Sequence, residues 1–77
     1  MEFEKLQEII AMQLSMEPAS VTEDKSFKGD LDADSLDLME IIMALEDELG
    51  IEIPDDELDA IVTVGDAYRA ISKADGE

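Results

Sequence analysis

The strongest constraint on the fold is the stretch from Asp30 to Glu48, where an acidic, turn-prone segment leads through Ser35 into the clearest helical pattern of the sequence. At about 100° per residue, the large apolar side chains of this pattern cluster within an arc of roughly 60°. They are Leu38, Ile42, Leu45 and Leu49, with Ile41 beside them. We therefore expect a helix that begins at Asp34 or Ser35, buries this arc and ends at Gly50, a residue suited to the left-handed position past a helix end.

Three further segments have helical patterns. Residues 2–16 carry apolar side chains at helical spacing, and Pro18 marks the end of this helix because the residue before a proline resists helical dihedrals. Pro54 can open a short helix with three acids in its first turn. Thr63 is typical of an N-cap, with Asp66 as its capping-box partner, at the start of a last helix. The sequence predicts an all-α fold, a small four-helix bundle with three main helices and one short helix, in a single domain over residues 1–77.

The segment from 17 to 34 is long for a connection inside a compact domain, and such loops are either functional or held in place by buried side chains. Val21, Phe27 and Leu31 are the apolar residues that we expect to anchor it. Gly29 and Asp30 supply turn-forming residues between these anchors and the central helix.

The chain is strongly acidic, with 22 Asp and Glu residues against 5 Lys and Arg and a formal net charge of −17. Nucleic acids and anionic membrane surfaces would repel it, whereas basic protein surfaces would attract it. Self-repulsion on this scale also predicts a fold that salt or divalent cations stabilise. No apolar run approaches the roughly 18 residues of a membrane span, and residues 1–5 lack a basic signal-peptide head, so we expect a soluble protein without membrane insertion. We also expect the chain to be a monomer and to lie in the cytoplasm.

The sequence contains neither cysteine nor histidine. The absence of cysteine is compatible with a reducing compartment and excludes both a disulfide and a thiolate supplied by the protein. General-base, nucleophilic and metal-binding roles would have to rest on carboxylates, hydroxyls, Lys or Tyr. We therefore predict that the chain is not an enzyme.

Asp30, Asp32 and Asp34 stand at alternate positions, like the first ligands of a calcium-binding EF-hand loop. The rest of that loop does not match, because its sixth position should be glycine and is Ser35, and its twelfth should be glutamate and is Ile41. We therefore expect no specific metal site and only weak, diffuse cation binding to the acidic surface.

Ser35 has two interpretations. Serine is a favoured N-cap, whose hydroxyl accepts a hydrogen bond from the first turn of a helix. Alternatively, the hydroxyl is exposed there, and a phosphate attached to it would lie among unpaired N–H groups at the positive end of the helix dipole. As a catalytic nucleophile Ser35 is poorly placed, since no histidine can activate it and the neighbouring acids disfavour an oxyanion. A serine modified by another enzyme fits better.

On the side of the central helix opposite the buried arc, Leu36 and Met43 lie almost in line. Carboxylates flank this apolar strip on both edges: Asp37, Glu40 and Asp47 on one, and Glu46 on the other. A solvated helix face with two isolated apolar residues gives this pattern, and so does a docking surface for a basic partner.

The central stretch reads Leu-Asp-Ala-Asp-Ser-Leu-Asp at residues 31–37, then Met-Glu at 39–40 and Ala-Leu-Glu-Asp-Glu-Leu-Gly-Ile-Glu-Ile-Pro-Asp at 44–55. With Thr-Val-Gly-Asp-Ala at 63–67, the amino-terminal helix and Phe27, it resembles an acyl carrier protein of the dissociated (type II) fatty acid synthase. This resemblance covers essentially the whole chain.

The resemblance implies that Ser35 is esterified with 4′-phosphopantetheine, which a phosphopantetheinyl transferase takes from coenzyme A, so that the chain becomes a phosphoprotein. The thiol of this cofactor would hold the growing fatty acyl chain as a thioester, which agrees with the absence of cysteine. Acyl chains would be sheltered between the helices, near Leu45 and Ile61, and delivered to the enzymes of fatty acid biosynthesis.

The resemblance further implies that the acidic central helix docks on basic patches of fatty acid synthase enzymes. The residues with this implied role are Asp34, Leu36, Asp37, Glu40, Met43, Glu46 and Asp47, with Ile53 and Asp55 at the short helix. One position departs from the family, which usually has glycine where this chain has Asp32. Aspartate tolerates left-handed dihedrals, so the turn can still form.

Two alternatives remain open from the sequence. The chain can be a carrier of a polyketide, lipoyl-precursor or other specialised acyl pathway, with the same chemistry and different enzymes. A different class of function is an unmodified acidic interaction module or a calcium-binding protein.

Overall fold

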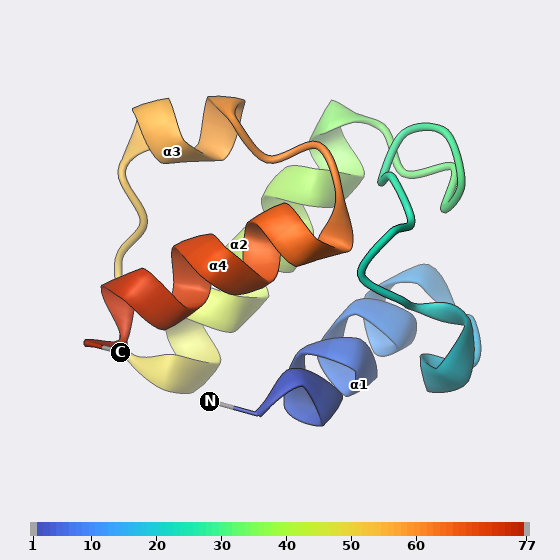
Figure 1. Ribbon diagram of the computed structural model, residues 1–77, viewed down its shortest axis with the longest axis horizontal. Coiled ribbons are helices and arrows are strands. Elements are labelled where there is room, and N and C mark those ends of the chain that lie inside the picture. Colours follow the sequence, from blue (N-terminus) through green and yellow to red (C-terminus); the bar gives the residue numbers. More distant parts are fainter. Residues whose placement is uncertain (1, 77) are drawn as a thin grey trace.

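Four α-helices and one short 3₁₀-helix form the computed structural model, which describes residues 2–76. They are α1 (Phe3–Leu14), η1 (Pro18–Ser20), α2 (Ser35–Leu49), α3 (Asp55–Asp59) and α4 (Val64–Ala74). Figure 1 shows the three long helices α1, α2 and α4, with α3 and the loop after η1 along one edge of the molecule. The described residues contain no β-strand, and the predicted all-α four-helix bundle is confirmed.

The α1 helix is shorter than the sequence predicted. Ser15 adopts left-handed dihedrals (φ 55°, ψ 49°), and its backbone N–H donates to the carbonyl oxygen of Ala11. The helix therefore ends before Pro18, which begins η1 instead. The prediction was wrong because it relied on the proline as the stop, whereas a non-glycine residue in the left-handed region, uncommon in proteins, had already reversed the chain.

The boundaries of α2 and α3 are close to those predicted. Gly50 ends α2 with a φ of 65°, and its backbone N–H donates to the carbonyl oxygen of Glu46. Pro54 is the N-cap of α3 and not its first residue, so this helix begins one position later than expected. Its first turn holds the three predicted acids, which suit the positive end of the helix dipole.

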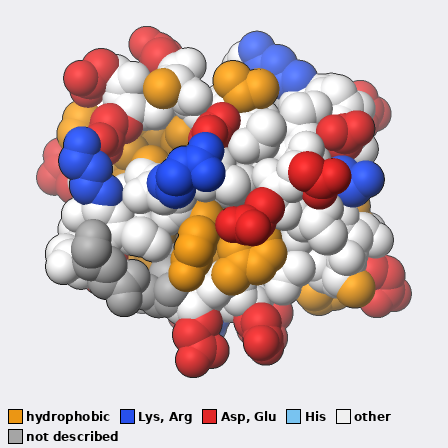
Figure 2. Space-filling view, viewed as in Figure 1, with side chains coloured by type: hydrophobic (Ala, Val, Ile, Leu, Met, Phe, Trp, Pro, Cys, Tyr) orange, Lys and Arg blue, Asp and Glu red, His pale blue; other side chains and the backbone are white. Residues whose placement is uncertain are grey.

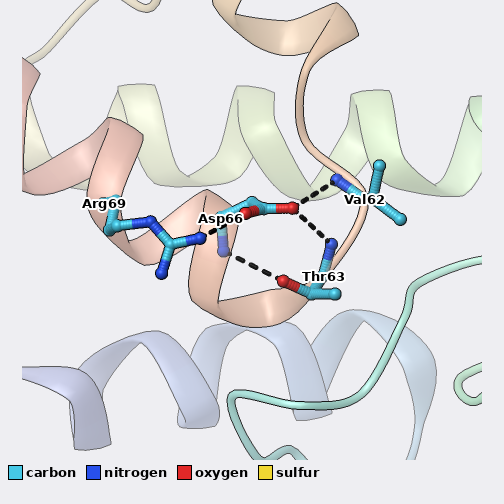
Figure 3. A network of polar contacts seen from close by, with 4 residues as sticks. All are labelled: Val62, Thr63, Asp66 and Arg69. Carbon is cyan, nitrogen blue, oxygen red and sulfur yellow. Dashed lines mark hydrogen bonds and ion pairs between the residues drawn. The ribbon is translucent and has the colours of Figure 1, made fainter.

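The capping box predicted at the start of α4 is present (Figure 3). The Thr63 hydroxyl accepts from the backbone N–H of Asp66 at 3.2 Å, and Asp66 Oδ2 accepts from the backbone N–H groups of Thr63 and Val62, each at 3.1 Å. Arg69 forms an ion pair with the other carboxylate oxygen. The hydrogen bonds from these two backbone N–H groups hold the pKa of Asp66 below its usual value, and the bond from Thr63 has the larger effect.

The core consists of aliphatic side chains around one buried aromatic ring, Phe27, which is 1% exposed. Both the helices and the loops contribute to it, through Leu6, Ile10, Ala11, Val21, Leu31, Ala33, Ile41, Ile42, Leu45, Ile53, Ile61, Val64, Ala67 and Ile71. The buried arc of α2 is thus close to the one predicted, although Leu38 and Leu49 lie at its half-buried edges. At the edge of the core, the rings of Phe3 and Tyr68 meet at a right angle, with centroids 5.3 Å apart.

The long loop before α2 is held by the anchors that the sequence predicted. Val21, Phe27 and Leu31 are 0%, 1% and 9% exposed. An isolated antiparallel bridge joins Ser26 to Thr63, and the Phe27 backbone N–H donates to the carbonyl oxygen of Val62 at 3.0 Å. These contacts join the loop to the connection between α3 and α4, and thereby fix the path of the chain into α2.

The α3 helix has five residues, none of them buried. Lys73 Nζ on α4 donates to Glu57 Oε1 at 2.9 Å, so one exposed ion pair joins the two helices. This hydrogen bond, with the charge of Glu57, raises the pKa of Lys73. Among the helices between residues 2 and 76, none has the length and apolar character needed to cross a membrane.

Candidate functional site

Ser35 is the first residue of α2 and not its N-cap. That role belongs to Asp34, whose carboxylate accepts from the backbone N–H of Asp37 at 3.0 Å, while Asp37 accepts from the backbone N–H of Asp34 at 3.3 Å. The capping interpretation of Ser35 is therefore wrong, because the carboxylate of the preceding aspartate already accepts the capping hydrogen bond from Asp37. Ser35 is exposed, and its hydroxyl makes no hydrogen bond to any residue between 2 and 76.

The turn before Ser35 combines a left-handed residue with a buried, hydrogen-bonded one. Asp32 has a φ of 54°, which is in the left-handed region. The family usually has glycine at this position, and aspartate is one of the few other residues that tolerate this conformation. The next residue, Ala33, is completely buried, and its backbone N–H donates to the carbonyl oxygen of Phe27 at 2.6 Å. Asp32 thus faces solvent while its neighbours Leu31 and Ala33 are buried, and Ser35 follows on a firmly held segment.

A cavity of about 210 Å³ lies next to Ser35, between α2 and the α3 region. Its walls are mostly apolar, and they also contain Ser35 and two charged residues. The apolar lining residues are Leu38, Met39, Ile42, Leu58 and Ile61, and the charged ones are Lys28 and Asp59. Ile61, which the resemblance implied as part of an acyl shelter, lines this space. Leu45, whose side chain is fully buried in the core, is not among the residues that line it.

The exposed side of α2 carries more apolar surface than the sequence indicated. Leu36 and Met43 are 66% and 59% exposed, and Met39 is 56% exposed. Met39 was missed because it lies to one side of the line from Leu36 to Met43. The helical angle alone could have found it, since Met39 lies about 60° from Leu36. Glu40 and Asp47 are exposed beside these residues, as predicted.

Several carboxylates predicted for docking also have structural roles. Asp34 and Asp37 form the capping box of α2. Glu46 is half-buried, and its Oε2 accepts from the backbone N–H of Ile53 at 2.9 Å, which joins the last turns of α2 to the segment before α3. Because these charges are engaged within the chain, their removal would change the fold locally as well as the surface charge.

Ile53 differs most from the role implied for it. Its side chain is 3% exposed and belongs to the core, so it offers almost no contact area to a partner in this conformation. Asp55 is exposed at the start of α3. An open groove of about 860 Å³ runs between α2 and residues 51–58 and is lined by five of the predicted docking residues: Met43, Glu46, Asp47, Ile53 and Asp55.

No group of three or more carboxylates among residues 2–76 is arranged to hold a metal ion. Figure 2 shows one face of the molecule, on which acidic side chains outnumber basic ones and patches of hydrophobic side chains lie between the charged ones. An exposed hydroxyl, a neighbouring apolar cavity and an acidic helix face suit a surface on which other proteins act.

Comparisons with known proteins agree with this arrangement. Residues 4–71 match the family model described as the phosphopantetheine attachment site. A solved structure from Mycobacterium tuberculosis, described as an acyl carrier protein, is 32% identical, with a TM-score of 0.86 over 94% of this chain and 97% of that one. The structure of the acyl carrier protein from Enterococcus faecalis is 39% identical, with a TM-score of 0.75 over 94% of this chain and 91% of that one.

Proposed function

This chain belongs to the family of phosphopantetheine-bearing acyl carrier proteins, and from that membership we propose that it carries fatty acyl chains on Ser35 and delivers them to the enzymes of fatty acid synthesis. Members of this family are carriers and not catalysts. The 4′-phosphopantetheine cofactor, when attached, supplies the thiol that holds an acyl group as a thioester.

The observation that carries the assignment of Ser35 is its free hydroxyl at the first position of α2. The hydroxyl is exposed, has no hydrogen-bond partner among residues 2–76 and lines the apolar cavity between α2 and α3. A transferase can therefore reach it without breaking a contact within the chain. The first turn of α2 also favours an anion at this point, since its N–H groups lie at the positive end of the helix dipole. The site thus fits a phosphoester.

A loading experiment tests this assignment. The unmodified chain is incubated with coenzyme A and a phosphopantetheinyl transferase, and its intact mass is measured. We expect one phosphopantetheinyl addition, which Ser35→Ala abolishes. Ser20→Ala, which changes another exposed serine, should still gain the addition. Absence of the addition on the unchanged chain, or its persistence in Ser35→Ala, contradicts the proposal.

We further propose that the exposed face of α2 recognises partner enzymes. Leu36, Met39 and Met43 would supply the contact that becomes buried, and Glu40 and Asp47 the charges that attract and orient a basic patch. Asp55 extends this acidic rim at α3. Ile53 is left out of the surface because its side chain is in the core.

A pair of methionine variants tests this face. Met43 on α2 and Met12 on α1 are 59% and 77% exposed, so alanine at either position removes a similar, weakly buried side chain. Met43→Ala should weaken binding of the loaded chain to a condensing enzyme of fatty acid synthesis by about five- to thirty-fold, the size of a contact worth 1–2 kcal/mol. Met12→Ala should leave the affinity unchanged. Equal effects would contradict the assignment to α2.

A charge-reversal pair tests the acidic rim. Glu40→Lys should slow productive encounter with a ketoreductase or condensing enzyme and reduce the salt dependence of the rate, because rim charges act mainly on association. Glu4→Lys, an exposed change on α1, should have little effect. Failure of all enzymes of fatty acid synthesis to accept the loaded chain, with normal loading of Ser35, would favour a carrier of another acyl pathway.

A further inference from the structure

Lys28 lines the same cavity as Ser35, from the loop that precedes α2. It is the only basic residue among those that line this cavity, and the chain has 5 Lys and Arg residues in all. Three of the five have acidic partners: Lys5 pairs with Glu48 at 3.4 Å, Lys73 with Glu57 at 2.9 Å, and Arg69 with Asp66. Lys28 forms no ion pair with any residue between 2 and 76. Its positive charge is therefore available to a ligand.

The backbone around Lys28 is fixed by its neighbours. Phe27 is buried and bonded to the α3–α4 connection. On the other side, the backbone N–H of Gly29 donates to the Ser26 hydroxyl at 3.2 Å, and the Ser26 backbone N–H donates to Asp30 Oδ2 at 2.9 Å. A side chain at Gly29 would place its Cβ 2.7 Å from the Ser26 oxygen, so the Ser26 hydroxyl would have to leave this position. The lysine side chain is thus exposed on a loop whose backbone is held on both sides.

The surroundings of Ser35 are otherwise acidic. Asp34 and Asp37 form the capping box, Asp32 is exposed in the preceding turn, and Asp59 is the second charged residue of the cavity. A phosphodiester on Ser35 is an anion at every physiological pH, and it would add negative charge to a chain that already carries −17. Carboxylates within one or two helical turns would disfavour it, and a cation beside it would offset that repulsion.

From these observations we propose that Lys28 binds the phosphodiester of the group carried on Ser35 and so acts as its positioning residue. The proposal rests on the proposed attachment at Ser35. An ammonium bonded to a phosphate oxygen forms a charge-assisted hydrogen bond, which is stronger than a neutral one. Held at its phosphate, the arm would begin beside the wall of the cavity that Lys28 and Ser35 both line. No bond is made or broken in this interaction.

The experiment compares loaded and unloaded forms of three chains: the unchanged chain, Lys28→Gln and Lys25→Gln. Lys25 is the matched control, since it lies on the same loop and does not line the cavity. Intact mass first verifies that each chain is fully loaded. The melting temperatures of both forms are then measured at low salt, and the phosphorus-31 resonance of each loaded form is recorded.

We expect Lys28→Gln to lower the melting temperature of the loaded form by about 2–5 °C more than that of the unloaded form, as an exposed charge pair does in a domain of this size. The phosphorus-31 resonance should move in Lys28→Gln, stay in place in Lys25→Gln and return towards its original position in Lys28→Arg. In about 1 M salt the extra loss should disappear, because the screening length falls to about 3 Å.

Equal melting-temperature losses in the loaded and unloaded forms of Lys28→Gln, with an unmoved phosphorus resonance, would overturn the proposal and leave Lys28 a purely structural loop residue. A change of the same size in Lys25→Gln would also overturn it, because the effect would then be one of overall charge. Failure of the unchanged chain to gain mass is a separate result, which contradicts the attachment at Ser35 itself.

Discussion

Replacing Asp34 and Ser35 one at a time by alanine tests which side chain caps α2. Asp34→Ala removes the carboxylate that accepts from the Asp37 backbone N–H at 3.0 Å. Loss of an N-cap costs about 1 kcal/mol, in a range of about 0.5–2 kcal/mol. In a domain of this size, 1 kcal/mol corresponds to about 4–8 °C in melting temperature. Ser35→Ala removes a hydroxyl without a hydrogen bond among residues 2–76, so its effect should stay within about 0.5 kcal/mol.

The charge of Asp34 must be separated from its capping bond, because removal of one acid relieves some self-repulsion in so acidic a chain. Asp34→Asn serves as the control, since the amide oxygen still accepts a hydrogen bond while the charge is gone. The melting temperatures of the variants, each without the attached cofactor, are measured by circular dichroism. The melting temperature of Asp34→Ala should be lower than those of both Asp34→Asn and Ser35→Ala. A loss in Ser35→Ala as large as that in Asp34→Ala would refute the assignment of the cap.

Three further predictions concern the core, the acidic surface and one capping carboxylate. Ile53→Ala should lower the free energy of unfolding by about 2–5 kcal/mol, as expected for a buried aliphatic side chain. Met43→Ala should change it by less than about 0.5 kcal/mol, because Met43 is exposed. Similar values for the two variants in urea unfolding would contradict this difference in burial. Added magnesium or calcium should raise the melting temperature by reducing self-repulsion, and a melting temperature indifferent to both ions would show that this repulsion is negligible. The pKa of Asp66 is lower in the folded chain than the usual 3.8, so its stabilising contribution is present above that pH and is lost as the pH falls through the lower folded value. The difference in melting temperature between the unchanged chain and Asp66→Asn should therefore shrink under acidification from pH 6 towards pH 2, and a constant difference would count against the shift.

The sequence predicted most of the fold because the signals for its helices are local. The spacing of apolar residues indicated the buried side of α2, and Gly50, Thr63 and Asp66 marked helix ends through chemistry that acts within a few residues. The end of α1 was not predictable in the same way. Serine rarely adopts left-handed dihedrals, and it does so at Ser15 without a local signal that distinguishes it from other serines.

The site was predicted less completely because several of its residues have more than one possible partner. From sequence, Ser35 was interpreted as a favoured cap, whereas the structure shows Asp34 in that role. The bond between Glu46 and the Ile53 backbone spans seven residues, and the burial of Ile53 depends on how the segment after α2 turns back on the core. The position of Lys28 beside Ser35 likewise depends on the path of the whole loop, which no local pattern determines.

The pairing of Ser26 with Thr63 has a consequence for the order of events when the chain is made. The loop that leads to Ser35 is held by residues 62–64, which a ribosome adds later, at about 5–20 residues per second. Until those residues leave the exit tunnel, Phe27 lacks its backbone partner at Val62, and the segment before Ser35 is held only by its local hydrogen bonds. A modifying enzyme that recognises this loop in its folded form would therefore act only after residues 62–64 have emerged.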